Sequence, residues 1–357
     1  MRSRKKLAVL AACLGLIVCV VACGVAGENK DTSFFSKSLH ATGEGMRYWY
    51  EEQGGFMKLT GIPYDKLGCK NCHVKSCDQC HAEKSGDEMV FSGAMSHQSD
   101  TCLKCHSRAK GTFAIDKANQ CLDVHMAAGF TCSRCHRGHD VHGDGKAYQS
   151  MRSPGAVEAD CQNCHTPEAT DSPAYESSLT AHSVHDDKLD CSACHVQSTF
   201  ACYNCHFSKF LETKTKKGNF IKTKDWLLLV NYEGKVTAGT AMTLVHNDKT
   251  FIGYGPYYTH SVGKGRKCES CHANPAVTKI NSGGKFVVSK FEDGKVVFSK
   301  GVVPAVPEKL EWVFLDKKGD DWVPLKDAAK PLIQWIEYGS PLTTDQIEKM
   351  AEPYESD

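Results

Sequence analysis

One short pattern recurs along this chain: two cysteines separated by two residues, with a histidine directly after the second. The chain has 357 residues and contains the pattern eight times. From first to eighth, the motifs are Cys69/Cys72/His73, Cys77/Cys80/His81, Cys102/Cys105/His106, Cys132/Cys135/His136, Cys161/Cys164/His165, Cys191/Cys194/His195, Cys202/Cys205/His206 and Cys268/Cys271/His272. Chance would supply on the order of 0.05 copies at this composition, so the repeat reflects a chemical requirement.

The spacing of the motif suits covalent attachment of haem c. Its two cysteines form thioethers with the two vinyl groups of one haem, and the adjacent histidine ligates the iron. Zinc sites built from Cys-x-x-Cys pairs do not need a histidine after every second cysteine, and thioredoxin-like proteins carry a single motif in a βαβ context. We therefore expect eight covalently bound haem c groups.

Two pairs of motifs are close neighbours in the sequence, within residues 69–81 and 191–206. Each doublet predicts two macrocycles that lie almost in contact. Seven motifs fall within residues 69–206, which leaves about twenty residues of chain for each haem. So little chain cannot build a conventional side-chain core, so the porphyrins must supply the apolar interior.

Each motif histidine fills one axial position of an iron, and nine other histidines are available for the second position. The expected distal ligands are His40, His97, His125, His142, His182, His185, His246 and His260. His139 is the alternative to His142, which we favour because Gly143 and Gly145 let the backbone turn sharply beside a macrocycle. Ligation by two histidines gives low-spin iron suited to electron transfer, whereas an open position indicates a reductase.

Cys121 belongs to no motif. Its simplest interpretation is a small buried apolar residue, and the alternatives are a free thiol, a disulfide partner or a ligand. The relay interpretation requires no catalytic residue, because the iron carries the chemistry.

Residues 1–27 have the pattern of an export signal. A basic start, "MRSRKK", precedes twenty-one residues without a charge. Three fates remain open: lipidation of Cys23, whose "VVAC" context resembles a bacterial lipobox, cleavage after Ala26, or retention as a membrane anchor. All three place the folded part in the periplasm or on the outer surface of a bacterium, on the oxidising side of a membrane.

The rest of the chain divides into three parts by pattern: a cover segment over residues 28–68, a seven-haem core over residues 69–206, and a β-rich part over residues 207–357 that carries the eighth haem. Turns are predicted at Glu233-Gly234 and Asp293-Gly294, with a further hairpin in "EWVFLDKKGDDWV". Thr343 and Gln346 have capping-box spacing and predict a closing helix. The expected fold class is a multihaem cytochrome c, with short helices and irregular chain around stacked haems and a small β-rich C-terminal part.

The charge of the chain argues against a nucleic-acid partner. The formal net charge is +1, and removing the four basic residues of the leader gives 1 − 4 = −3 for a chain that starts at Cys23. Eight ferric haems with both propionates ionised would each add about −1, so the mature protein would be acidic.

The chain resembles the multihaem c-type cytochromes of anaerobically respiring bacteria, and by motif count the octahaem group. The segment "DVHMAAGFTCSRCHRGHDVHGDG" is similar to one in octahaem cytochromes grouped with tetrathionate reductases. This resemblance implies haems in alternating parallel and perpendicular stacked pairs. Ammonia-forming nitrite reductases of the wider group replace one motif histidine with lysine, whereas all eight motifs here end in histidine.

The sequence thus predicts an electron carrier of anaerobic respiration. Its expected donor is a quinol-oxidising membrane complex or a periplasmic cytochrome. Its expected acceptor is another cytochrome, a terminal reductase or an extracellular acceptor. Two alternatives remain: a reductase of a small sulfur or nitrogen oxyanion, such as tetrathionate or nitrite, or of hydroxylamine, at one high-spin haem, and a subunit of a conductive cytochrome filament.

Overall fold

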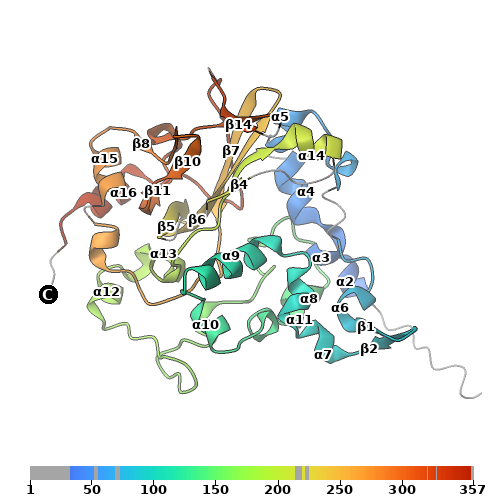
Figure 1. Ribbon diagram of the computed structural model, residues 1–357. Helices are drawn as coiled ribbons and strands as arrows, with labels where there is room; N and C mark the ends of the chain where they lie inside the picture. Colours follow the sequence, from blue (N-terminus) through green and yellow to red (C-terminus); the bar gives the residue numbers. More distant parts are fainter. Residues whose placement is uncertain are drawn as a thin grey trace, which may run out of the picture.

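The computed structural model describes residues 33–51, 55–68, 73–213, 219–221, 225–272, 274–319, 321–326 and 328–354. The expected leader, with Cys23, lies outside these ranges, as do Cys69 and Cys72 of the first motif. Within the described ranges no helix is long and apolar enough to cross a membrane. In Figure 1 a C-terminal sheet occupies the upper part of the molecule, and the segment that carries most of the motifs runs below it.

The N-terminal segment consists of short helices that cover one side of the sheet. They are α2 (Ser33–Ser36), α3 (Leu39–Thr42), α4 (Glu44–Glu51) and α5 (Phe56–Thr60). Buried Tyr50, Leu59 and Tyr64 form a small cluster that includes Phe251 of the sheet. The amide of Gln334 donates a 2.7 Å hydrogen bond to the carbonyl of Trp49. The segment therefore packs on the sheet, and not only beside the first motif.

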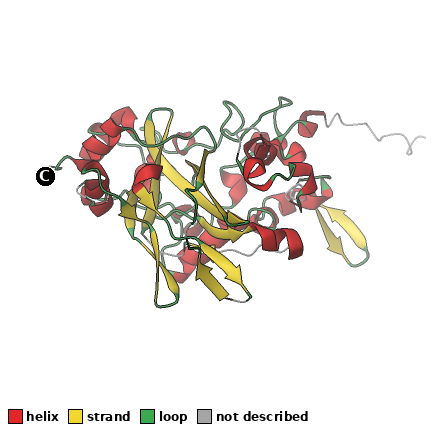
Figure 2. Ribbon diagram, turned by 90° about the horizontal axis from the view of Figure 1, so that it is seen from above, coloured by secondary structure: helices red, strands yellow, loops and turns green. Residues whose placement is uncertain are grey.

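The segment from residue 73 to residue 201 contains short helices joined by irregular chain. Its helices are α6 (Asp78–His81), α7 (Gly93–Ser96), α8 (Ser99–Leu103), α9 (Ser107–Ala118), α10 (Val124–Ala127), α11 (Gly138–His142), α12 (Thr180–Ser183) and α13 (Cys191–His195). One hairpin, β1 (Ala82–Ser85) with β2 (Glu88–Phe91), interrupts them. It projects at one end of the molecule, opposite the C-terminus (Figure 2).

This helical segment has almost no side-chain core. Between residues 73 and 192, all of which are described, Ala156 is the one buried apolar residue. Nine of the sixteen large apolar side chains that are exposed lie between residues 89 and 184. A chain that leaves its apolar side chains uncovered cannot offset its conformational entropy by its own packing, so this segment requires another apolar component.

The C-terminal part holds the principal core, around a seven-stranded sheet. The strands are β3 (Cys202–His206), β4 (Asn219–Phe220), β5 (Trp226–Tyr232), β6 (Lys235–His246), β7 (Lys249–Pro256), β11 (Gly301–Pro304) and β15 (Leu332–Trp335). The order is β11-β5-β6-β3-β4, and β7 pairs with both β6 and β15. Residues 226–230 of β5 are buried without alternation, which is typical of a strand covered on both faces.

Smaller elements complete the C-terminal part. They are α14 (Phe207–Thr213), α15 (Pro275–Asn281), β8 (Phe286–Val287), β9 (Ser289–Glu292), β10 (Lys295–Phe298), β12 (Leu310–Glu311), β13 (Leu315–Lys318), β14 (Asp321–Pro324) and α16 (Thr344–Ala351). The capping box of Thr343 and Gln346 at the start of α16 is confirmed. Helices α15 and α16 lie together at the side of the sheet (Figure 1).

The predicted hairpins are confirmed. Glu233 and Gly234 join β5 to β6, and Asp293 and Gly294 join β9 to β10, each pair with positive φ at both residues. Strands β13 and β14 form the third predicted hairpin. Two two-residue turns were not predicted: Gly86-Asp87 joins β1 to β2, and Asn247-Asp248 joins β6 to β7 with φ of 49° and 61°. Asn and Asp tolerate this left-handed conformation without glycine, so the sequence signal is weaker there.

The sheet begins earlier in the chain than expected. Strand β3 carries the seventh motif and pairs with β6 in parallel and with β4 antiparallel. The boundary expected between residues 206 and 207 therefore falls inside the sheet, at the end of β3, because the seventh motif is itself one of its strands.

The uneven distribution of core residues predicts how the chain behaves without haem. In the chain expressed in the cytoplasm, where haem c is not attached, we expect amide hydrogens between residues 73 and 192 to exchange rapidly with solvent. Amides of β5, β6 and β7 keep measurable protection, because their core consists of side chains. Hydrogen exchange followed by mass spectrometry measures both regions, and equal protection of the two would contradict this interpretation.

Candidate functional site

Most of the motifs form a single helical turn. In the second, third, fourth, fifth and eighth motifs the histidine amide donates to the carbonyl of the first cysteine, over 2.9 to 3.0 Å. The sixth motif is helix α13 itself. In such a turn residues three and four apart lie on one face, so the second cysteine and the histidine share the side of the first cysteine. Asp160 and Asp190 cap the turns of the fifth and sixth motifs through the amides of Gln162 and Ser192.

Six motif histidines face a histidine from elsewhere in the chain. The ring centroids are 6.0 Å apart for His106 and His40, for His81 and His142, and for His165 and His125. They are 6.2 Å apart for His136 and His260 and for His272 and His185, and 6.5 Å apart for His195 and His182. In each pair one member belongs to a motif and the other does not.

This separation fits a metal ion between the two rings. An imidazole nitrogen lies about 1.2 Å from its ring centre and about 2 Å from a metal that it ligates, so rings on opposite sides of one ion have centroids about 6.4 Å apart. No hydrogen bond joins the two rings of any pair in the part of the chain that the structure describes. The six pairs therefore match the spacing that two axial ligands of one iron require.

Six of the twelve paired rings have a hydrogen bond through Nδ1, and the ring of His40 also bonds the backbone of Val141. Five Nδ1 atoms donate to backbone carbonyls over 2.7 to 3.0 Å, those of His165, His182, His185, His195 and His272. The sixth, Nδ1 of His136, donates to a carboxylate oxygen of Asp140 over 3.0 Å. A donor at Nδ1 fixes the neutral tautomer whose Nε2 has a free lone pair, which is the form that ligates metals.

Burial also favours neutral imidazoles at these positions. It is the main cause that lowers the pKa of His40, His106, His142 and His260 below the usual histidine value. Neighbouring histidines add to this effect, because like charges disfavour protonation. These rings are therefore available as ligands at neutral pH.

The cysteine sulfur atoms, which would form the thioethers, bring successive motifs together. The thiols of Cys102 and Cys132 share a hydrogen bond, as do those of Cys161 and Cys191. Burial raises the pKa values of four further thiols, and a thiol of a neighbouring motif adds to each shift: Cys105 for Cys80, Cys164 for Cys135, Cys268 for Cys194 and Cys194 for Cys271. These two hydrogen bonds and four electrostatic interactions relate the motifs in the order second, third, fourth, fifth, sixth, eighth.

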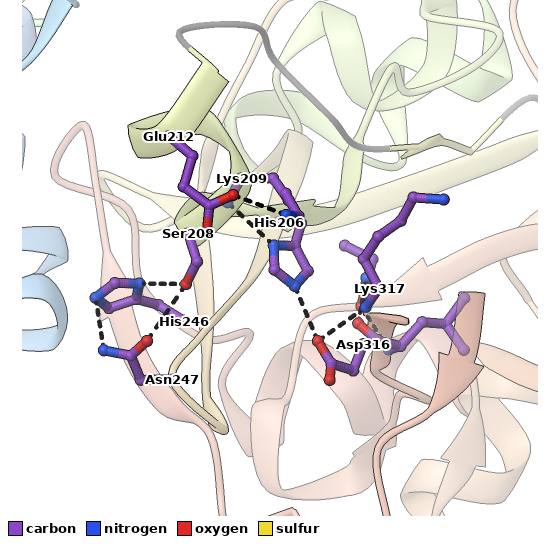
Figure 3. Close-up of polar contacts among 10 residues, drawn as sticks. His206, Ser208, Lys209, Glu212, His246, Asn247, Asp316 and Lys317 are labelled. Carbon is purple, nitrogen blue, oxygen red and sulfur yellow. Dashed lines mark hydrogen bonds and ion pairs between the residues drawn. The ribbon is translucent and has the colours of Figure 1, made fainter. Parts of the chain in front are cut away.

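Two motif histidines face oxygen atoms instead of a second imidazole. Nε2 of His206 donates to Oδ1 of Asp316 over 2.8 Å, beside Lys317 (Figure 3). Nε2 of His73 lies 3.4 Å from the hydroxyl of buried Tyr64, and the two rings are stacked. Both histidines thus use Nε2 for a polar contact, whereas the oriented rings of the paired histidines keep Nε2 free of hydrogen bonds to any residue that the structure describes. The seventh motif also differs in conformation, because it is an extended strand.

Two of the expected distal ligands face no motif histidine in the described part of the chain. Nδ1 of His97 lies 2.9 Å from the hydroxyl of Ser133, within the fourth motif. His246 bonds Ser208 and packs against Phe207. Val245 is the residue paired with His206 on β6, so His246 points to the other side of the sheet. A count of the histidines outside the motifs takes no account of the face of the strand on which each lies. Strand alternation places His246 away from the seventh motif.

The alternative between His142 and His139 has a clear geometry. His142 faces His81, whereas His139 lies among acidic side chains, with Nε2 3.7 Å from Glu158 and 3.9 Å from Asp144.

Cys121 is half-buried and follows helix α9. Asp140 and Asp316, which contact motif histidines, were not among the sequence candidates. No helical spacing pointed to Asp140, because extended backbone at Arg137 separates His136 from helix α11, in which Asp140 lies.

Comparison with known proteins does not assign the chain to a family. No protein-family model matches it, and no curated protein or solved structure is significantly similar to it. Function has to be inferred from the residues of this chain.

Asp123 shows how two histidine-bearing segments are held in place. Its buried carboxylate accepts from the amides of His125 and Met126 at the start of α10, over 2.9 and 3.2 Å, and from the amide of Val262 over 2.8 Å. One side chain thus fixes the segment of His125 and the segment of His260.

Replacing Asp123 should destabilise both segments. We expect Asp123→Ala to cost about 2–4 kcal/mol of stability, because it removes a helix cap and leaves three amides without an acceptor. Asp160→Ala, which removes one exposed cap, is the matched control and should cost about 0.5–1 kcal/mol. Thermal unfolding followed by circular dichroism compares the two variants, and equal losses would contradict the bridging role of Asp123.

Proposed function

We propose that this protein is an exported octahaem c-type cytochrome that relays electrons in anaerobic respiration. The observation that carries the proposal is the set of six motif histidines, each facing a non-motif histidine at 6.0 to 6.5 Å between ring centroids. The eight motifs, the scarcity of buried apolar side chains between residues 73 and 192, and the Nδ1 hydrogen bonds support it independently.

The side chains have separate tasks in this function. When bound, haem supplies reversible one-electron chemistry at its iron, and the protein sets ligands, burial and spacing. The motif cysteines would hold each haem covalently, and the paired imidazoles would ligate its iron, which would exclude water and substrates from it. Backbone carbonyls that accept from Nδ1 keep the rings in a fixed orientation and raise their basicity as ligands.

The interactions between cysteine thiols suggest the order in which electrons pass. They link the second, third, fourth, fifth, sixth and eighth motifs into one series. The second motif lies beside the projecting hairpin β1–β2, and the eighth precedes α15 near the C-terminus. In the proposal these two motifs are the ends of the series. They are where a quinol-oxidising complex or periplasmic cytochrome delivers electrons, and where another cytochrome, a terminal reductase or an extracellular acceptor receives them.

The pairing of His81 with His142 gives a direct test of ligation. We expect His142→Ala to convert one low-spin haem in eight into a high-spin or weakly ligated haem, because it removes a distal ligand and leaves the motif intact. His139→Ala is the matched control on the same helix and should leave every low-spin signal unchanged.

Low-temperature electron paramagnetic resonance of the oxidised protein distinguishes these outcomes, with haem content quantified on the same samples. A wild-type protein without covalent haem would refute the proposed function. A low-spin spectrum that His142→Ala leaves unaltered would refute the assignment of His142.

A second candidate function is reduction of a small sulfur or nitrogen compound at a haem with an open distal position. The specific observation that favours it is the environment of His206 and His73, which face Asp316 and Tyr64 rather than an imidazole. A carboxylate beside a reacting ligand can serve in proton transfer, which reduction of oxyanions requires. Lys317 is adjacent and adds positive charge that attracts anions (Figure 3).

Ligand binding separates the two candidates. At most two irons in eight lack a paired histidine, so we expect high-spin signals from no more than two haems in the wild-type protein. In a reductase these signals shift when nitrite, hydroxylamine or tetrathionate is added. The turnover rate of a reductase also falls in Asp316→Ala, but not in Asp321→Ala, which changes a residue on the same hairpin. High-spin signals that no ligand alters would leave electron relay as the function.

A further inference from the structure

The fourth motif differs from the other paired motifs in the group that orients its histidine. Nδ1 of His136 donates to Oδ2 of Asp140 over 3.0 Å, whereas the other Nδ1 donors with a hydrogen bond of normal length use backbone carbonyls. His125 lies 3.4 Å from Asp123, but that carboxylate oxygen already accepts from two backbone amides. Among the described rings, His136 is thus the paired histidine with a hydrogen-bonded carboxylate.

Asp140 is held firmly in the position that makes this contact. Its side chain is only 4% exposed, and its second oxygen, Oδ1, accepts a 2.7 Å hydrogen bond from the amide of Glu158. Asp140 lies in helix α11, and the extended backbone of Arg137 separates that helix from His136. The same helix, α11, carries His142, so the residue is part of a rigid element that serves two histidine pairs.

From this geometry we infer that Asp140 lowers the reduction potential of the fourth haem relative to the other haems with two histidine ligands. The inference rests on the proposed function. A carboxylate that accepts the Nδ1 proton increases the electron density on the ring, which makes the imidazole a stronger donor to iron. Stronger donation and a nearby negative charge favour ferric over ferrous iron, and so lower the potential. Asp140 acts through His136 and is a positioning residue.

The fourth haem lies inside the series of haems, so its lower potential affects how electrons pass along the series. A thiol hydrogen bond to the third motif and an electrostatic interaction with a thiol of the fifth put the fourth motif inside the series rather than at an end. The carboxylate of Asp140 is itself buried, so solvent does not screen its charge strongly. The fourth haem is then the least readily reduced of the six paired haems, and electrons cross it without accumulating there.

The test is a potentiometric titration of the holoprotein, followed by visible absorption and by electron paramagnetic resonance. In Asp140→Asn, which keeps an acceptor of similar shape but removes the charge, we expect the most negative bis-histidine component to move to higher potential. A tenfold change in its ratio of ferric to ferrous iron corresponds to about 59 mV for a one-electron couple. Asp160→Asn, the same substitution beside the fifth motif without contact to an imidazole, should move none.

Asp140→Glu provides a second variant that keeps the charge and should retain a low potential, so the inference stays testable if Asp140→Asn lowers the yield. Eight haems per chain with unchanged potentials in Asp140→Asn would overturn the inference and leave the proposed function standing. Absence of covalent haem in the wild-type protein would overturn both. A change confined to one component, with low-spin signals retained, would support the role of Asp140.

Discussion

The structure depends on imidazole rings that face each other from segments far apart in the chain. His40 meets His106, His136 meets His260 and His185 meets His272, each at about the separation that one metal ion requires. In the proposed cytochrome these pairs act as cross-links through iron. They join the N-terminal helices and the loop after β7 to the motif-bearing segment. That segment has too few buried apolar side chains between residues 73 and 192 to hold these parts by packing.

Two ways of building an interior therefore meet in one chain. The sheet around β5 and β6 is a conventional core, in which residues such as Trp226 and Leu228 are fully buried by other side chains. The motif-bearing segment exposes residues such as Phe91 and Val184, which porphyrin surfaces would cover in the holoprotein. Covalent attachment suits this second kind of interior, because it limits the freedom of the unfolded chain much as disulfides do in small secreted domains.

Local chemistry in the sequence predicted much of this architecture. Motif spacing, type I′ turns at Glu233-Gly234 and Asp293-Gly294, and the capping box at Thr343 all depend on neighbouring residues. Which histidine faces which motif was beyond the sequence, because His260 meets His136 only through the path of the whole chain. His246 was expected as a ligand, but parallel pairing of β3 with β6 places it on the opposite side of the sheet from His206.

The seventh motif shows how secondary structure controls the chemistry of an identical pattern. In a helical turn the second cysteine and the histidine share one face, whereas in a strand consecutive residues point to opposite faces. Cys205 packs beside the aromatic cluster under the N-terminal helices, and His206 turns to Asp316. Attachment of a haem at this motif therefore competes with the pairing of β3, while the helical motifs already present their groups together. The same five-residue pattern thus yields paired histidines on helical turns, and in the sheet a histidine that faces a carboxylate beside a lysine.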